Sequence, residues 1–202
     1  MTRTFVALLI PSAWTEYLGA ITEQLREGAS GLSWVKPGNV HVTIRFLGDL
    51  GDAGVKRACD AVVRAASPLE APLARLGGLG GFPSLARPRV LWVGLSEGEE
   101  AVRTLGSAVN DGLRQAGFDP LDKPFRPHMT LARVREGARG LEAIRAAAIP
   151  PPPPAERLDR ICVMKSELHP SGSRYTALTE VRLRPPGGST PTPPRPGQST
   201  ES

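Results

Sequence analysis

Two segments of this chain repeat one four-residue pattern: a histidine, a hydrophobic residue, a threonine and a second hydrophobic residue. They are His41-Val42-Thr43-Ile44 and His128-Met129-Thr130-Leu131, and each follows a turn that contains proline. Residues two apart share one face of a β-strand, whereas a helix puts them on different sides. The pattern therefore predicts two strands that each present an imidazole and a hydroxyl on one face and pack hydrophobic residues into the core.

Paired histidines and threonines of this kind suit the cleavage of a phosphoester. One imidazole can act as a base and the other as an acid, because the ordinary pKa of histidine lies near ~6.5. Threonine hydroxyls can donate hydrogen bonds to phosphate oxygens, and phosphoryl transfer depends mainly on positioning and charge stabilisation. We therefore expect one active site that needs no metal, formed by His41, Thr43, His128 and Thr130.

Structural histidines and a zinc site are the alternatives. A lone strand histidine is usually structural, but this chain has three histidines and two of them occupy the same pattern. Two well-separated histidines without a third ligand nearby do not match a zinc cage, so no metal ligand is predicted. The third histidine, His169, lies in a turn, where we expect it to be exposed and without a role.

Two arginines near these histidines are candidates for contacts with phosphate or a nucleobase. Arg45 continues the face of His41 and Thr43. Arg126 precedes His128 by two residues. Strand alternation places both arginines near the predicted cleft, where guanidinium groups bind phosphate well. Solvated arginines at a strand edge are the alternative.

Three aromatic residues are possible platforms for a nucleobase, since single-stranded RNA ends are commonly held on aromatic faces. By alternation Phe46 falls on the core face, which favours packing over stacking. Phe125 and Tyr175 are the better stacking candidates, with core packing as the alternative for each.

The order of predicted elements indicates an α+β protein. Helices are expected over residues 12–25, 52–66, 97–116 and 140–147, and strands over 4–10, 32–35, 40–47, 90–93, from 126 or 128 to 134, 157–164 and 174–183. Each half contains a helix, a turn with proline and a His-x-Thr strand. This duplication predicts two pseudo-symmetric lobes, with antiparallel sheets flanking a central cleft and helices outside. Residues 1–184 are expected to form the domain, and the Pro/Gly/Ser/Thr-rich residues 185–202 a disordered tail.

Composition narrows the partners without fixing them. The net charge of +5 and a pI near 9.8 favour acidic partners, nucleic acid first, although four of the 25 basic residues are lysines and no dense basic run exists. The short apolar run at residues 5–10 predicts a buried first strand and not a signal peptide, so we expect a cytoplasmic protein without a membrane span. Cys59 and Cys162 match no metal or redox spacing and are predicted to be buried thiols.

Longer stretches around the two histidines resemble the signature segments of the 2H phosphoesterase superfamily. These stretches are His41-Val42-Thr43-Ile44-Arg45-Phe46-Leu47-Gly48 and Pro124-Phe125-Arg126-Pro127-His128-Met129-Thr130-Leu131-Ala132-Arg133. Trp34-Val35-Lys36-Pro37, Lys165-Ser166-Glu167-Leu168 and Gly172-Ser173-Arg174-Tyr175 add to the likeness. Within the superfamily, residues 4–183 are most similar to the bacterial and archaeal RNA 2′,3′-cyclic phosphodiesterases, historically called 2′-5′ RNA ligases.

The resemblance implies hydrolysis of an RNA-terminal or nucleoside 2′,3′-cyclic phosphate to a 2′-phosphomonoester, without metal or cofactor. It implies that His41 is the proton donor to the departing 3′ oxygen and His128 the proton acceptor from water, with Thr43 and Thr130 on the phosphate. Reverse 2′-5′ RNA ligation would use the same groups. Arg133 belongs to the family signature, yet simple alternation puts it opposite His128; a β-bulge between Thr130 and Arg133 would reconcile the two.

The implied partners are RNA 3′ ends or tRNA fragments that carry a 2′,3′-cyclic phosphate, with no membrane and no obligatory protein partner, and the protein is expected to be a monomer. Two other functions stay open at this point. One is a non-catalytic module that binds RNA ends, and the other is a 2H phosphodiesterase acting on another cyclic or 2′-5′ phosphodiester.

Overall fold

The structure, a computed structural model, describes residues 1–169 and 172–187, and its α+β fold confirms the predicted class. The helices are α1 (Ser12–Glu27), the 3-10 turn η1 (Pro37–Asn39), α2 (Asp52–Ala66), α3 (Glu99–Gln115) and α4 (Leu141–Ala146). The strands are β1 (Thr2–Leu8), β2 (Ser30–Trp34), β3 (Val42–Leu50), β4 (Leu73–Phe82), β5 (Val90–Glu97), β6 (Met129–Arg139), β7 (Glu156–Arg157), β8 (Arg160–Glu167) and β9 (Arg174–Arg182). Most of the predicted tail, residues 188–202, lies outside the described residues, so the division at residue 184 stays a prediction.

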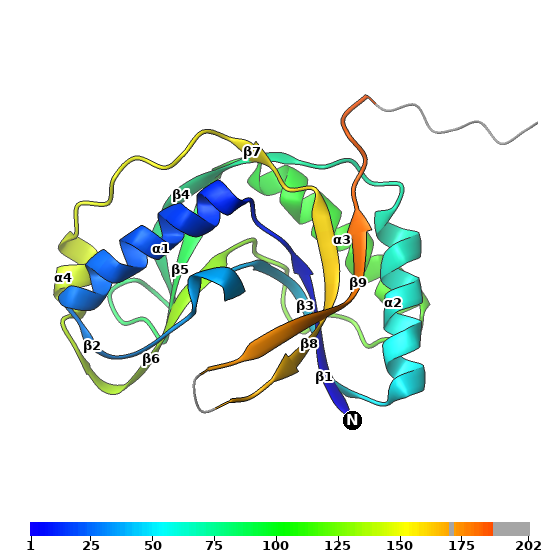
Figure 1. Ribbon diagram of the computed structural model, residues 1–202, viewed down its shortest axis with the longest axis horizontal. Helices are drawn as coiled ribbons and strands as arrows, with labels where there is room; N and C mark the ends of the chain where they lie inside the picture. The colour runs from blue at the N-terminus through cyan, green and yellow to red at the C-terminus, as the bar shows by residue number, and fades with distance from the viewer. Residues whose placement is uncertain (170–171, 188–202) are drawn as a thin grey trace, which may run out of the picture.

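The strands form one curled sheet whose two halves meet at the histidine strands. Its order is β7-β4-β5-β6-β3-β1-β8-β9, with β2 also paired to β6, and neighbouring strands run antiparallel. Among the described residues, β3 and β6 share the single register pair Val42–Met129, which lies where the halves meet. Helices α1 and α4 lie beside one half, and α2 and α3 beside the other (Figure 1). The predicted two lobes with outer helices are confirmed. The two predicted sheets are the two halves of one continuous sheet.

A β-bulge interrupts each histidine strand shortly after its histidine. Along β3, Thr43 pairs with Ala7 and Arg45 with Val6, so Ile44 is the extra residue. The same shift occurs on β6. A bulge leaves two consecutive residues on one side and reverses the alternation of the residues that directly follow it.

The bulge in β3 overturns two expectations that were based on strict alternation. Arg45 is 7% exposed and lies with Ile44 in the protein interior. Phe46, expected in the core, is 63% exposed. Strict alternation failed here because it assumes a regular pleat through the whole strand.

The bulge in β6 is the one needed to place Arg133 on the same side of the strand as Thr130. Thr130 pairs with Trp92 and Ala132 with Leu91, which makes Leu131 the extra residue. Leu131 and Ala132 are both buried, and Arg133 is exposed on the side of Thr130. The predicted bulge between Thr130 and Arg133 is confirmed.

The glycine-rich strand β4 was not predicted as a strand because glycine has low strand propensity. Gly80 pairs in register with Trp92 of β5, and the indole lies across the space that a Cβ at Gly80 would occupy. An aromatic ring that covers a cross-strand glycine shields the exposed backbone. Trp92 in turn packs 5.1 Å from Phe82, ring centre to ring centre, close to His128.

The burial of the hydrophobic core and of the thiols agrees closely with what the sequence predicts. Helix α1 buries Trp14, Leu18 and Ile21, as its periodicity predicts. Cys162 is a buried free thiol whose pKa is raised by burial to about 12, and Cys59 is half-buried. No helix in residues 1–169 and 172–187 has the length and apolar character needed to cross a membrane.

Gly80→Ala is expected to destabilise the protein, by roughly 1–3 kcal/mol in the free energy of unfolding, because the new methyl group overlaps the Trp92 indole. Gly78→Ala on the same strand is the matched control, since a Cβ there meets no atom within 4 Å. This control should be neutral or stabilising by up to about 1 kcal/mol. Urea denaturation measures both, and a stabilised Gly80→Ala protein would contradict the packing of Trp92 over this glycine.

Candidate active site

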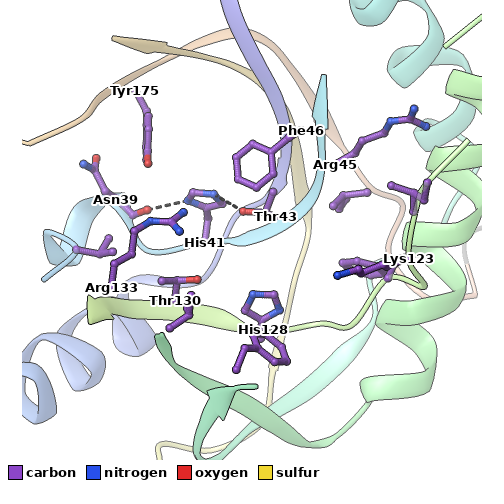
Figure 2. A pocket seen from close by; sticks show the side chains of 16 residues that line it. Asn39, His41, Thr43, Arg45, Phe46, Lys123, His128, Thr130, Arg133 and Tyr175 are labelled. Carbon is purple, nitrogen blue, oxygen red and sulfur yellow. Dashed lines mark hydrogen bonds between the residues drawn. The ribbon is translucent and has the colours of Figure 1, made fainter. Parts of the chain in front are cut away.

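A cavity of about 400 Å³ lies where β3 and β6 meet. It is lined by both histidines and both threonines of the repeated pattern, His41, Thr43, His128 and Thr130 (Figure 2). Each histidine stands one residue before the Val42–Met129 pair, so the pairing of β3 with β6 brings the two imidazoles to the same cavity.

The His41 ring is fixed on every side. Its Nδ1 lies 2.7 Å from the Asn39 carbonyl oxygen and its Nε2 lies 2.9 Å from Thr43 Oγ1. Since a carbonyl oxygen only accepts, Nδ1 carries the hydrogen, and in the neutral ring the Thr43 hydroxyl donates to Nε2. The imidazole stacks on Phe5 at 5.0 Å between ring centres, and the edge of Tyr175 approaches it at 5.6 Å.

The His128 ring has the same anchor and a freer second nitrogen. Its Nδ1 donates to the carbonyl oxygen of Arg126, two residues earlier, over 2.7 Å. Phe82 meets the ring edge to face at 4.9 Å and Trp92 lies 6.1 Å away. Within residues 1–169 and 172–187, His128 Nε2 has no hydrogen-bond partner, so its lone pair faces the cavity unoccupied in the neutral ring.

Burial lowers the pKa of both imidazoles below the ordinary histidine value. The hydrogen bonds from Nδ1 to a backbone carbonyl oppose this effect, and the positive charge of His128 adds to it for His41. A low dielectric disfavours the charged imidazolium. Both rings are therefore neutral near pH 7 before an anion binds.

Besides Thr43, Thr130 and Arg45, the predicted substrate-binding residues Arg133, Phe125 and Tyr175 line the cavity. Figure 2 shows the Arg133 guanidinium reaching toward Asn39 and His41. Phe125 is half-buried against the hydrophobic core, and Tyr175 contacts Phe5 edge to face at 4.9 Å between ring centres. Both aromatic residues thus combine packing with a position at the cavity wall.

Arg45 lies near the cavity as predicted, but it is not on the face of His41 and Thr43. Arg45 borders the cavity, but its guanidinium turns away from the two imidazoles and donates to the carbonyl oxygen of Asp119 (Figure 2). The bulge at Ile44 puts this side chain on the interior side of β3. Arg45 therefore holds the loop that connects α3 to the second histidine segment.

The predicted placement of Arg126 also needs correction. Strand β6 begins at Met129, so strand alternation does not apply to Arg126, whose exposed side chain lies outside the central cavity. Its carbonyl oxygen orients His128, and its side chain borders an adjoining hollow.

Sequence reasoning missed several residues that line the cavity, above all Phe46, Asn39 and Lys123. Phe46 occupies the position after its bulge that Arg133 occupies in the other half. Applying the bulge inferred for the second segment to the first would have placed Phe46 correctly. Asn39 acts through its backbone carbonyl, for which the sequence holds no signal.

The cavity contains groups that can transfer protons and groups that can bind an oxyanion. It combines two neutral imidazoles, two hydroxyls and the cations Arg133 and Lys123, neither of which forms an ion pair with any described carboxylate. Among the described residues, no group of three His, Cys, Asp or Glu side chains is placed to hold a metal ion. Hydroxyl and cationic groups around a phosphate stabilise its negative charge during transfer.

Comparison with known sequences places the chain beside one family. The sequence model of the 2′-5′ RNA ligase superfamily matches residues 10–170. An RNA 2′,3′-cyclic phosphodiesterase of Archaeoglobus fulgidus is 34% identical over 134 residues, which cover 66% of this chain and 73% of that protein. An RNA 2′,3′-cyclic phosphodiesterase of Aquifex aeolicus is 30% identical over 190 residues, which cover 90% and 97%.

Solved structures share the fold. TT0787 of Thermus thermophilus superposes with a TM-score of 0.74 at 29% identity, over 91% of this chain and 99% of that one. E. coli LigT complexed with 3′-AMP superposes with a TM-score of 0.67 at 22% identity, over 90% and 98%. The curled sheet around a central cavity is therefore a known architecture.

Titration of the free protein should give midpoints below 6.5 for both His41 and His128, because burial disfavours each imidazolium. Inorganic phosphate should raise both midpoints, since a bound anion stabilises the protonated rings. NMR with ¹⁵N-labelled histidine measures the midpoints and should also find both neutral rings protonated at Nδ1. Midpoints above 6.5 in the free protein, or an Nε2–H tautomer, would contradict this site geometry.

Proposed function

This chain belongs to the 2′-5′ RNA ligase superfamily, and on that basis we propose that it hydrolyses 2′,3′-cyclic phosphates at RNA 3′ ends to 2′-phosphomonoesters. The curated relatives at 34% and 30% identity are RNA 2′,3′-cyclic phosphodiesterases. The observation that carries the proposal is the shared cavity in which two matched strands present two imidazoles and two hydroxyls.

The cyclic phosphate binds between the two rings. Thr43 and Thr130 donate hydrogen bonds to its non-bridging oxygens, and Arg133 and Lys123 balance its negative charge. When the phosphate binds, the Thr43 hydroxyl exchanges its hydrogen bond to His41 for one to the phosphate. The anion also raises the pKa of the neighbouring imidazoles, which supplies the protonated ring that the reaction needs.

His128 is the base and His41 the acid in this proposal. A water molecule attacks phosphorus and gives its proton to the unoccupied Nε2 of His128, while the bond from phosphorus to the 3′ oxygen breaks. His41 delivers the proton from its Nε2 to that departing oxygen. The free Nε2 of His128 supports its role as proton acceptor, since the Nε2 of His41 is already bonded to Thr43. Proton exchange with solvent then restores the starting state.

Ligation follows from the same geometry. If a 5′-hydroxyl of a second RNA takes the place of water, the product is a 2′-5′ phosphodiester, and the reverse cleavage exchanges the roles of the two histidines. The substrates we infer are RNA 3′ ends or tRNA fragments with a cyclic phosphate, consistent with the net charge of +5. A cytoplasmic monomer remains the prediction made from the sequence.

His41→Ala and His128→Ala should each lower kcat by at least about 10²-fold, the lower range for losing general acid or base help. The assay is hydrolysis of a nucleoside 2′,3′-cyclic phosphate in the presence of EDTA, with chromatography of the product. His169→Ala is the matched control, because the third histidine is exposed and outside the cavity. Full activity in either cavity variant would contradict the two-histidine mechanism. A 3′-phosphate product, or loss of activity with EDTA, would contradict the proposed reaction.

A substrate in which sulfur replaces the 3′ oxygen should restore activity to His41→Ala and leave His128→Ala inactive. A thiolate departs without a proton, because the thiol pKa, near ~8.5, is far below that of an alcohol. The released thiol can be followed with a thiol reagent. Rescue of His128→Ala instead of His41→Ala would show that the proton roles are reversed.

A further inference from the structure

A second hollow opens beside His128. Its volume is about 640 Å³, and His128 and Thr43 line both this hollow and the central cavity. Arg89, Lys123 and Arg126 surround it. The hollow is thus continuous with the place where the cyclic phosphate binds, and three cationic side chains border it.

These three cations are exposed and free to bind an anion. Within residues 1–169 and 172–187, none of them forms an ion pair with a carboxylate, and none donates a side-chain hydrogen bond to another protein group. Their charges are therefore not neutralised by the protein. Arginine pairs well with phosphate through its forked donors, and lysine adds a point charge.

A neighbouring hollow shows the contrast. It also holds arginines, but Arg103 lies 2.6 Å from Glu99 and 3.0 Å from Glu100, and Arg114 lies 3.5 Å from Asp111. The charges of Arg103 and Arg114 are thus already neutralised by carboxylates, and Arg45, which also lines that hollow, donates to the carbonyl oxygen of Asp119. Of the two hollows, the one beside His128 is the better anion site.

We propose that the hollow formed by Arg89, Lys123 and Arg126 binds the phosphate on the 5′ oxygen of the terminal nucleotide. This inference rests on the proposed function, because it takes the cyclic phosphate to lie between His41 and His128. In an RNA chain, that 5′ phosphate is the phosphodiester that leads to the preceding nucleotide. The chain then leaves the active site past His128, and the enzyme favours nucleotide ends over bare nucleosides.

The kinetic test compares three substrates: a nucleoside 2′,3′-cyclic phosphate, the same compound with a 5′-phosphate, and a dinucleotide ending in the cyclic phosphate. The wild-type protein should give a lower KM for the two substrates that carry a 5′ phosphate. A lower KM for the dinucleotide alone would assign the hollow to a phosphodiester. An equally low KM for both 5′-phosphorylated substrates would show that any 5′ phosphate suffices. Equal KM values for all three substrates would overturn the proposal.

Arg89→Gln removes one cation that borders the hollow and does not line the central cavity. The ratio of kcat/KM for the dinucleotide to that for the nucleoside should fall about tenfold, the lower range for removal of a charged hydrogen bond. The dependence of log kcat/KM on log salt for the dinucleotide should become shallower by about 0.7 for each phosphate that the variant no longer neutralises. Arg64→Gln on the exposed face of α2 removes the same charge elsewhere and should leave the ratio unchanged. An unchanged ratio in Arg89→Gln would overturn the proposal.

A binding measurement separates this inference from the proposed function. By calorimetry, a nucleoside 2′,5′-bisphosphate should bind the wild-type protein at least about tenfold tighter than a nucleoside 2′-phosphate. Arg89→Gln should lose this advantage, with its melting temperature confirming that it folds. If no substrate turns over but the bisphosphate keeps its advantage, the proposed reaction is wrong and the second phosphate site stands. If the substrates turn over but the bisphosphate binds no tighter than the 2′-phosphate, the proposed reaction stands and the second phosphate site is wrong.

Discussion

The pairing of Val42 with Met129 is the contact on which the site depends, because it is the only register pair that joins β3 to β6 among the described residues. Every other pairing of these two strands within the sheet lies inside one half. The two histidines immediately precede this pair, so the position of each imidazole relative to the other is set by how the halves meet. The buried core on both sides of the sheet fixes that meeting, since Val42 and Met129 are completely buried.

Each half orients its imidazole and lowers the pKa of that ring in the same two ways. A carbonyl two residues earlier holds Nδ1 at 2.7 Å and turns Nε2 toward the cavity. An aromatic ring packs on each imidazole, Phe5 on His41 and Phe82 on His128, and burial lowers the pKa of both imidazoles. Neutral rings at neutral pH suit a base, and the acid must gain its proton as the anionic substrate arrives. The halves differ in the second nitrogen, since Nε2 of His41 is bonded to Thr43 and Nε2 of His128 has no hydrogen-bond partner among the described residues; the proposed direction of proton transfer is based on this difference.

Positive charge that the protein does not neutralise also lies beyond the place proposed for the reacting phosphate. Arg45 binds the loop after α3, and several arginines on the helices are paired with carboxylates, whereas Arg89, Lys123 and Arg126 form no ion pair with any described carboxylate. An anion therefore finds unneutralised charge where the cavity opens beside His128. A modest overall charge of +5 is enough for this, because the charge is local.

Local sequence patterns were sufficient to predict that His41, Thr43, His128 and Thr130 share one cavity, since the repeated His-x-Thr pattern defines two strand faces through alternation. They were also sufficient for the α+β class and most helices, with α2 found at its observed bounds, because helical periodicity is local. The directions of side chains beyond the bulges needed the folded sheet, which turns Phe46 to the cavity and Arg45 to the interior and makes glycine-rich β4 a strand under Trp92. Bulges and cross-strand packing are set by the register of partner strands far away in the chain, and alternation along a single strand does not contain that register.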